Sequence, residues 1–122
     1  MKWLAARFRY AFAGLRYGAA RDRSVRFQFL LALLAIAAGF LLKISREDWF
    51  WIALSITLVI TCEIFNSCIE KTVDYISLER NIQARMIKDM AAAAVFCASL
   101  FALFCACMIF GPALLALSGW QQ

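Results

Sequence analysis

The side chains best suited to chemistry lie close together in the sequence, at spacings that place them on one face of a helix. They are Glu63, Asn66, Glu70 and Asp74, at relative positions i, i+3, i+7 and i+11. At 3.6 residues per turn they fall within an arc of about 80°. Carboxylate and amide oxygens on one stripe are ligands that Mg²⁺ accepts.

A second group of charges is predicted at the same level of the molecule. Lys88 and Asp89 open a later helix, and Asp22 ends a basic segment. Two carboxylates can hold Mg²⁺ while a lysine meets phosphate oxygens, so the set suits a metal–polyphosphate complex. Taken alone, Lys88-Asp89 is equally compatible with a solvated helix start. None of the five glycines begins a phosphate-binding loop motif, and there is no histidine. The residues by themselves indicate metal-assisted chemistry on a phosphate or lipid headgroup.

The elements that position these residues are predicted to span a membrane. The chain has 122 residues, of which 65% are hydrophobic, and its mean hydropathy is +0.75. About 20 residues of helix cross a bilayer. Three apolar runs meet or approach this length, with Arg26 and Lys43 able to snorkel at the ends of the shorter first one: 27–44, 49–69 and 90–117. The first run also resembles a signal peptide, but its basic region is long and two further spans follow.

The predicted depth of Glu63 in the membrane bears on whether the polar stripe has a function. An ionisable residue near the middle of a membrane costs about 2.5–3.5 kcal/mol on insertion scales. The alternative is that Glu63 lies at the interface and only pairs with an arginine of the N-terminal segment. Asn66 and Glu70 share its face, which favours a functional site over a single structural ion pair.

The distribution of Lys and Arg predicts how the chain is oriented. Residues 1–26 carry seven basic side chains and residues 71–89 carry four, whereas the 43–48 turn carries two that are balanced by Glu47 and Asp48. Basic segments stay on the cytoplasmic side. We therefore expect a multi-pass membrane protein with a cytoplasmic N-terminus. The net charge of +5 is interpreted as attraction to anionic lipid headgroups, not to nucleic acid.

The predicted fold is an all-α membrane protein formed by one domain, 1–122. Residues 1–24 have the pattern of an amphipathic helix in the headgroup plane, although a plain membrane anchor fits as well. Ser45-Arg-Glu-Asp48 resembles a capping box. The second span is expected to continue to about Tyr75, followed by a polar loop at 76–85 and a third helix from near Arg85. The five cysteines all fall in predicted spans, as packing residues without disulfides.

Three segments together resemble the prokaryotic diacylglycerol kinase and undecaprenol kinase family. The first is Glu63-Ile-Phe-Asn66-Ser-Cys-Ile-Glu70-Lys-Thr-Val-Asp74. The second is Lys88-Asp89-Met-Ala-Ala-Ala-Ala-Val95. The third is Tyr10-Ala-Phe-Ala-Gly14-Leu15, with the acidic Asp22 eight residues after Gly14. The resemblance covers nearly the whole chain, and the spacing between the segments also agrees.

The resemblance implies an ATP-dependent kinase of a membrane lipid alcohol, with a surface helix, three transmembrane helices and composite sites between the subunits of a homotrimer. It implies that Glu63 is the general base and that Asp22 and Glu70 hold Mg²⁺. Asn66 and Arg26 would contact the lipid. Nucleotide contacts would come, besides the two metal ligands, from Tyr10, Asp74, Glu79, Arg80, Asn81, Lys88 and Asp89.

Some positions depart from the family pattern. Asp22 stands where Glu is usual, Asn81 where His is common, and Gln28 where His or Glu is common. The stretch from Gly39 to Trp49 is more similar to the undecaprenol kinase branch, so undecaprenol is favoured over diacylglycerol. Two other interpretations remain: a non-enzymatic subunit whose acids pair with arginines, and an ion-conducting oligomer with Glu63 in its pore.

Overall fold

The computed structural model describes residues 1–76, 79 and 81–119. The chain folds into four helices: α1 (Lys2–Arg21), α2 (Arg23–Leu42), α3 (Arg46–Ile76) and α4 (Ile82–Leu117). The last three are long and apolar enough to cross a membrane. The all-helical fold with three candidate spans is therefore confirmed. Arg80, predicted to contact nucleotide, lies outside the described residues.

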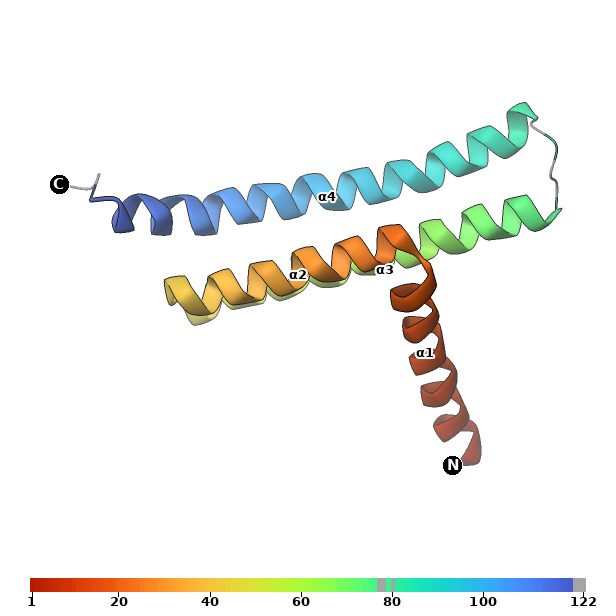
Figure 1. The fold of residues 1–122 in the computed structure, drawn as a ribbon, viewed down its shortest axis with the longest axis horizontal. Helices are drawn as coiled ribbons and strands as arrows, with labels where there is room; N and C mark the ends of the chain where they lie inside the picture. Colours follow the sequence, from red (N-terminus) through yellow and green to blue (C-terminus); the bar gives the residue numbers. More distant parts are fainter. Residues whose placement is uncertain (77–78, 80, 120–122) are drawn as a thin grey trace.

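The helices α2, α3 and α4 run side by side, and α1 projects from them at a steep angle (Figure 1). The most extensive packing joins α3 to α4, followed by α2 with α3. The buried side chains of α3 are spaced three or four residues apart, so they form its inward face. They are Ile52, Ser55, Val59, Glu63 and Ser67. The polar residue Glu63 thus lies in the same row as the apolar core.

The turn between α2 and α3 is fixed by local chemistry. Lys43 adopts the left-handed conformation with φ of 52° and ends α2. The Ser45 hydroxyl oxygen accepts the Asp48 amide at 3.1 Å, as the predicted capping pattern requires. Gly39 is packed so closely that a Cβ there would lie 2.6 Å from the Trp49 ring. The hairpin at this end is consequently tight.

Side-chain caps set two helix starts earlier than the sequence pattern indicates. Asp22 accepts the Val25 amide at 3.1 Å, and α2 begins at Arg23, ahead of the apolar run at 27. Asn81 accepts the Ala84 amide at 2.7 Å, and α4 begins at Ile82, ahead of Arg85. Both caps satisfy an amide that the first helical turn leaves without a partner.

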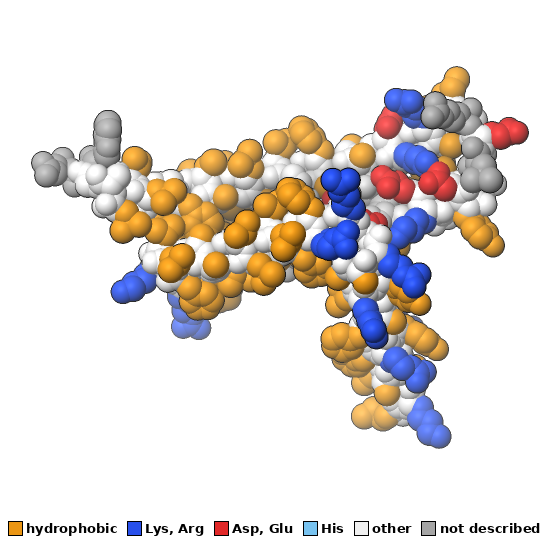
Figure 2. All heavy atoms as spheres, viewed as in Figure 1, with side chains coloured by type: hydrophobic (Ala, Val, Ile, Leu, Met, Phe, Trp, Pro, Cys, Tyr) orange, Lys and Arg blue, Asp and Glu red, His pale blue; other side chains and the backbone are white. Residues whose placement is uncertain are grey.

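The surface divides into an apolar part and a charged part. Hydrophobic side chains cover the visible outer faces of α2 and α4, whereas basic side chains follow α1 and charges of both signs gather near the α3–α4 connection (Figure 2). All five cysteines are free thiols, of which Cys105 is buried, Cys62 is half-buried and the other three are exposed on the single chain. The apolar part is what a lipid-facing surface requires, and the charged end is where the candidate site lies.

Candidate active site

Glu63 is the most enclosed ionisable side chain of the predicted set. Only 5% of its surface is exposed, and it lies on the inward face of α3. Asp22 and Glu70 are near enough to repel its charge, and Ser24 is near enough to hydrogen-bond to it. The structure therefore brings together three of the acids that the sequence singled out, from the α1–α2 corner and from α3.

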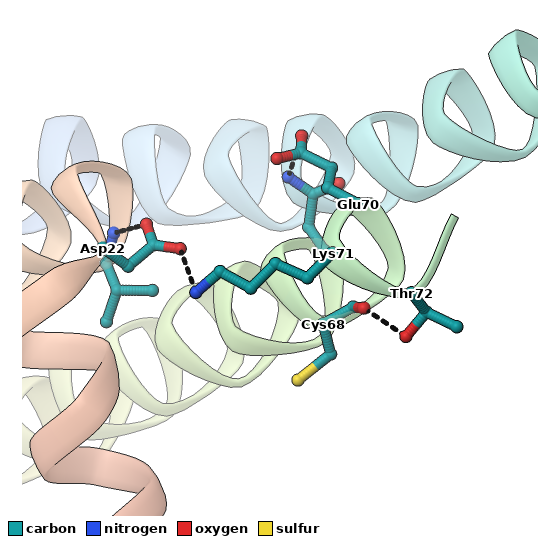
Figure 3. A network of polar contacts seen from close by, with 7 residues as sticks. Asp22, Cys68, Glu70, Lys71 and Thr72 are labelled. Atoms are coloured by element: carbon teal, nitrogen blue, oxygen red, sulfur yellow. Dashed lines mark hydrogen bonds and ion pairs between the residues drawn. The ribbon is translucent and has the colours of Figure 1, made fainter. Parts of the chain in front are cut away.

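Asp22 occupies the corner between α1 and α2. Its Oδ1 accepts the Val25 amide, and its Oδ2 lies 3.8 Å from the Lys71 ammonium of α3 (Figure 3). Burial alone raises the pKa of Asp22. Hydrogen bonds from the Ser67 side chain and from the Val25 and Ser24 amides, together with the positive charge of Lys71, outweigh this effect and bring its pKa below the ordinary value. Asp22 is thus held as a carboxylate.

One turn beyond Glu63, Asn66 and Glu70 form a pair along α3. The Asn66 amide nitrogen donates to the Glu70 carboxylate at 3.3 Å. The Asn66 carbonyl oxygen is buried and has no hydrogen-bond partner among the residues that the structure describes. A buried acceptor without a partner is costly. This oxygen could therefore accept a hydrogen bond from a ligand or coordinate a cation.

Two of the residues predicted to contact nucleotide, one on α3 and one on α4, contact each other. Lys88 donates a hydrogen bond to Asp74 and forms an ion pair with it, which links the two helices at the charged end. Asp89, Glu79 and Asn81 are exposed. The Asn81 side chain caps α4, a structural role that the sequence analysis did not assign to it.

Two predicted site residues lie apart from this cluster within one chain. Tyr10 is 67% exposed on α1, twelve residues before Asp22, which is about 18 Å along a helix at 1.5 Å per residue. Arg26 turns toward the end of α1, where its Nη1 donates to the Ala20 carbonyl at 3.5 Å. A cation there is favourable because the C-terminus of a helix is negative.

The donor set of the cluster suits Mg²⁺. The Asp22 and Glu70 carboxylates and the Asn66 carbonyl all offer oxygen, the ligand type that Mg²⁺ prefers. Within the described part of the chain, no three Asp, Glu, Cys or His side chains are gathered closely enough to hold a metal by themselves. Mg²⁺ commonly takes only one or two carboxylates and completes its shell with substrate phosphates and water, so a shared site is compatible with this arrangement.

A partly open groove of about 370 Å³ runs between α2, α3 and α4 at the level of the apolar runs. It begins at Gln28 and Ile60, which is one turn from Glu63, and continues past Ser55 and Ser99 to Phe110. Most of its lining is apolar. Within the described part of the chain, the buried Ser55 hydroxyl in this groove has no hydrogen-bond partner.

The sequence analysis missed Ser24, Ser67 and Lys71 at the site. Ser67 follows Glu63 by four residues, so helical spacing could have placed it on the same face. No spacing rule could have placed Ser24 or Lys71, because they approach Glu63 and Asp22 from different helices.

Comparisons with known proteins agree on one family. Residues 9–110 match the family model described as prokaryotic diacylglycerol kinase. The chain is 36% identical to a diacylglycerol kinase of Pseudomonas aeruginosa over 73% of this chain and 72% of that protein. It is 32% identical to an undecaprenol kinase of Bacillus subtilis over 88% and 87%, and 31% identical to a diacylglycerol kinase of Escherichia coli K12 over 82% of each.

Proposed function

This chain belongs to the prokaryotic diacylglycerol kinase family, and we propose that it transfers the γ-phosphoryl group of ATP to the hydroxyl of a membrane lipid alcohol. The observation that carries the proposal is the position of Glu63. It is buried in a helix able to cross a membrane, and it lies beside the carboxylates of Asp22 and Glu70. Such a position lets one carboxylate meet a lipid hydroxyl while its neighbours meet the nucleotide.

In the proposed reaction, Glu63 takes the proton of the lipid hydroxyl as that oxygen attacks the γ-phosphorus. The bond from the γ-phosphorus to the bridging oxygen breaks, and ADP leaves. Phosphoryl transfer depends mainly on positioning and on charge neutralisation. The enclosure of Glu63 supports the role, because it excludes the water that would compete with the lipid hydroxyl.

Asp22 and Glu70 are proposed to hold Mg²⁺, which supplies positive charge to the β- and γ-phosphates when bound. Two features support this assignment: the Val25 amide occupies only the Oδ1 of Asp22, and Glu70 is accessible on the surface of α3. Asp74 and Lys88 lie next along the charged end and are proposed to contact the nucleotide. The same role is proposed for Tyr10, Glu79, Arg80, Asn81 and Asp89.

The lipid is proposed to lie with its hydroxyl at Glu63 and its hydrocarbon chain in the groove between α2, α3 and α4. The volume of about 370 Å³ falls within the usual range for small-molecule sites, about 300–1,000 Å³. Asn66 and Arg26 are proposed to orient the headgroup, Asn66 through its unpartnered carbonyl oxygen. Undecaprenol is proposed as the preferred substrate, and diacylglycerol is the alternative.

The assembly is proposed to be a homotrimer in the bacterial inner membrane, with the N-terminus cytoplasmic and α1 in the headgroup plane. Two features of the single chain support this arrangement. The helix α1 has no buried residue and projects away from the other helices (Figure 1). Tyr10 therefore needs a second copy to bring it to the carboxylates.

The test is direct phosphorylation. Purified full-length protein is incubated with Mg²⁺ and γ-labelled ATP in mixed micelles that contain undecaprenol or diacylglycerol. We expect label in the lipid fraction, faster with undecaprenol. Label in neither lipid would contradict the kinase assignment, and faster labelling of diacylglycerol would reverse the substrate preference.

A further inference from the structure

The Lys71 side chain lies across the gap between two parts of the site. It starts from α3 and extends toward the α1–α2 corner, whereas its neighbour Glu70 points to the other side of α3 (Figure 3). Its Nζ lies 3.8 Å from Asp22 Oδ2. The other oxygen of Asp22 is occupied by the Val25 amide. Lys71 therefore approaches the Asp22 oxygen that does not cap the helix, which is the more open of the two to a metal ion.

The charges around this oxygen explain why a cation is needed there. The side chain of Asp22 is only 13% exposed, so water screens its charge poorly. Glu63 is close enough to Asp22 for their charges to repel each other. Lys88 pairs with Asp74 instead. Among the described residues, Lys71 makes the only ion pair to Asp22 or to Glu63.

The Lys71 ammonium at Asp22 can be replaced by another cation. Only one partner of the pair is enclosed: the Lys71 side chain is 68% exposed, whereas that of Asp22 is 13% exposed, so the ammonium can be solvated by water outside the pair. The lysine head, on its flexible stem, can move into water, but the largely buried Asp22 carboxylate then needs another cation in its place. A divalent cation at the same oxygen would displace it readily.

We propose that Lys71 is the internal counter-ion of the metal-free site: it occupies the metal position at Asp22 and is displaced when a divalent cation binds. This inference rests on the proposed role of Asp22 as a metal ligand. Lys71 is a positioning residue in this scheme, because it acts on the metal through Asp22. Its positive charge offsets the negative charge of Asp22 when no cation is bound, and it weakens cation binding by competition.

The experiment measures cation binding without nucleotide or lipid. Mn²⁺ is the probe, since it shares the charge of Mg²⁺ and its preference for oxygen ligands. Free Mn²⁺ is followed by electron paramagnetic resonance during titration of the full-length protein in detergent. We expect Lys71→Gln to bind Mn²⁺ about two- to fivefold more tightly than the wild type, the size of effect that an exposed ion pair gives. Lys71→Arg, which keeps the charge, should bind like the wild type.

Two controls separate the possible failures. Lys2→Gln removes the same charge at the far end of α1 and should leave Mn²⁺ affinity unchanged; an equal increase there would show a general charge effect and overturn the proposal. In protein that already carries Asp22→Asn, adding Lys71→Gln should no longer change Mn²⁺ affinity. If Asp22→Asn alone does not weaken Mn²⁺ binding, both the metal assignment and the inference are wrong. If it does, and Lys71→Gln alone binds like the wild type, only the inference is wrong.

Discussion

At the Arg46 end of α3 the polar groups of the first turn satisfy one another locally, whereas toward the Ile76 end a buried acceptor has no partner among the described residues and acidic side chains lie close together. Ser45 caps the first turn through Asp48, and Gly39 lets the Trp49 ring pack against α2. At the other end, the Asn66 carbonyl is buried without a partner, and Glu63 is enclosed beside other acids. The first end is held by local contacts within the chain, and the second carries the groups that the proposed ligands would contact.

This difference indicates where stability and activity reside. Sites that bind charged ligands commonly retain unfavourable interactions that the ligand relieves, and the rest of the fold supplies the stability to support them. Substitutions at the Ile76 end of α3 should therefore change activity more than stability. Substitutions at the Arg46 end should do the reverse.

The largest effect is expected for Glu63→Gln. Loss of a general base typically lowers kcat by about 10²–10⁴-fold. The thermal unfolding temperature should stay the same or rise, because a poorly solvated charge is removed. The matched control at the other end of α3 is Glu47→Gln, which should keep full activity. Lipid phosphorylation and thermal unfolding in detergent measure both effects, and a Glu63→Gln enzyme with more than about a tenth of the wild-type rate would contradict the assignment.

Substitutions of Asp22 should separate its two roles. Asparagine keeps an oxygen that can accept the Val25 amide but removes the charge. Asp22→Asn should therefore retain stability while raising the Mg²⁺ concentration needed for half-maximal rate at least about tenfold, as loss of a metal-site contact does. Asp22→Ala should in addition lose about 0.5–2 kcal/mol of unfolding free energy, because the helix cap is lost. Equal Mg²⁺ requirements in wild type and Asp22→Asn would remove Asp22 from the metal site.

At the structural end, Gly39→Ala should affect stability alone. A Cβ at this position would lie 2.6 Å from the Trp49 ring, and overpacking of this kind typically costs about 1–3 kcal/mol. The KM for ATP should be unchanged. The double variant Gly39→Ala with Trp49→Phe should recover part of the loss, because the smaller ring makes room. Chemical unfolding in micelles is the measurement, and unchanged stability in Gly39→Ala would show that the hairpin is less tightly packed than the structure indicates.

The comparison of the two ends also explains how far the sequence could predict the structure. The features at the Arg46 end depend on neighbours in the chain, so the Ser45 cap and the tight hairpin follow from residue types. The polar stripe on α3 follows from helical spacing, and the three spans follow from hydropathy. These were predicted from the residues, and the family resemblance is confirmed.

Contacts between helices could not be predicted in the same way. Nothing in the spacing of α3 indicates that Lys71 reaches Asp22 or that Ser24 approaches Glu63, because such contacts depend on how the helices pack. Asp22 and Asn81 are residue types that favour caps, but the sequence analysis did not assign them that role. The hydrophobic pattern begins a few residues after each helix does, so the starts predicted for α2 and α4 were too late.

The smallest effect is expected at Asn81, which lies at the charged end but has a structural role. Its Oδ1 caps α4 through the Ala84 amide, so only its amide nitrogen remains for the proposed nucleotide contact. Asn81→Ala should lose about 1 kcal/mol of unfolding free energy, and Asn81→Ser should recover it, because serine is also a good cap.

The KM for ATP then distinguishes the two roles of Asn81. Both variants lack the amide nitrogen, so both should show a KM raised by about two- to tenfold, the loss expected for one hydrogen bond. An increase in Asn81→Ala that disappears in Asn81→Ser would mean that the residue acts only through the cap. Asn81 would then be a helix cap alone, as Ser45 is, although it lies beside the proposed ligand-binding end of the molecule.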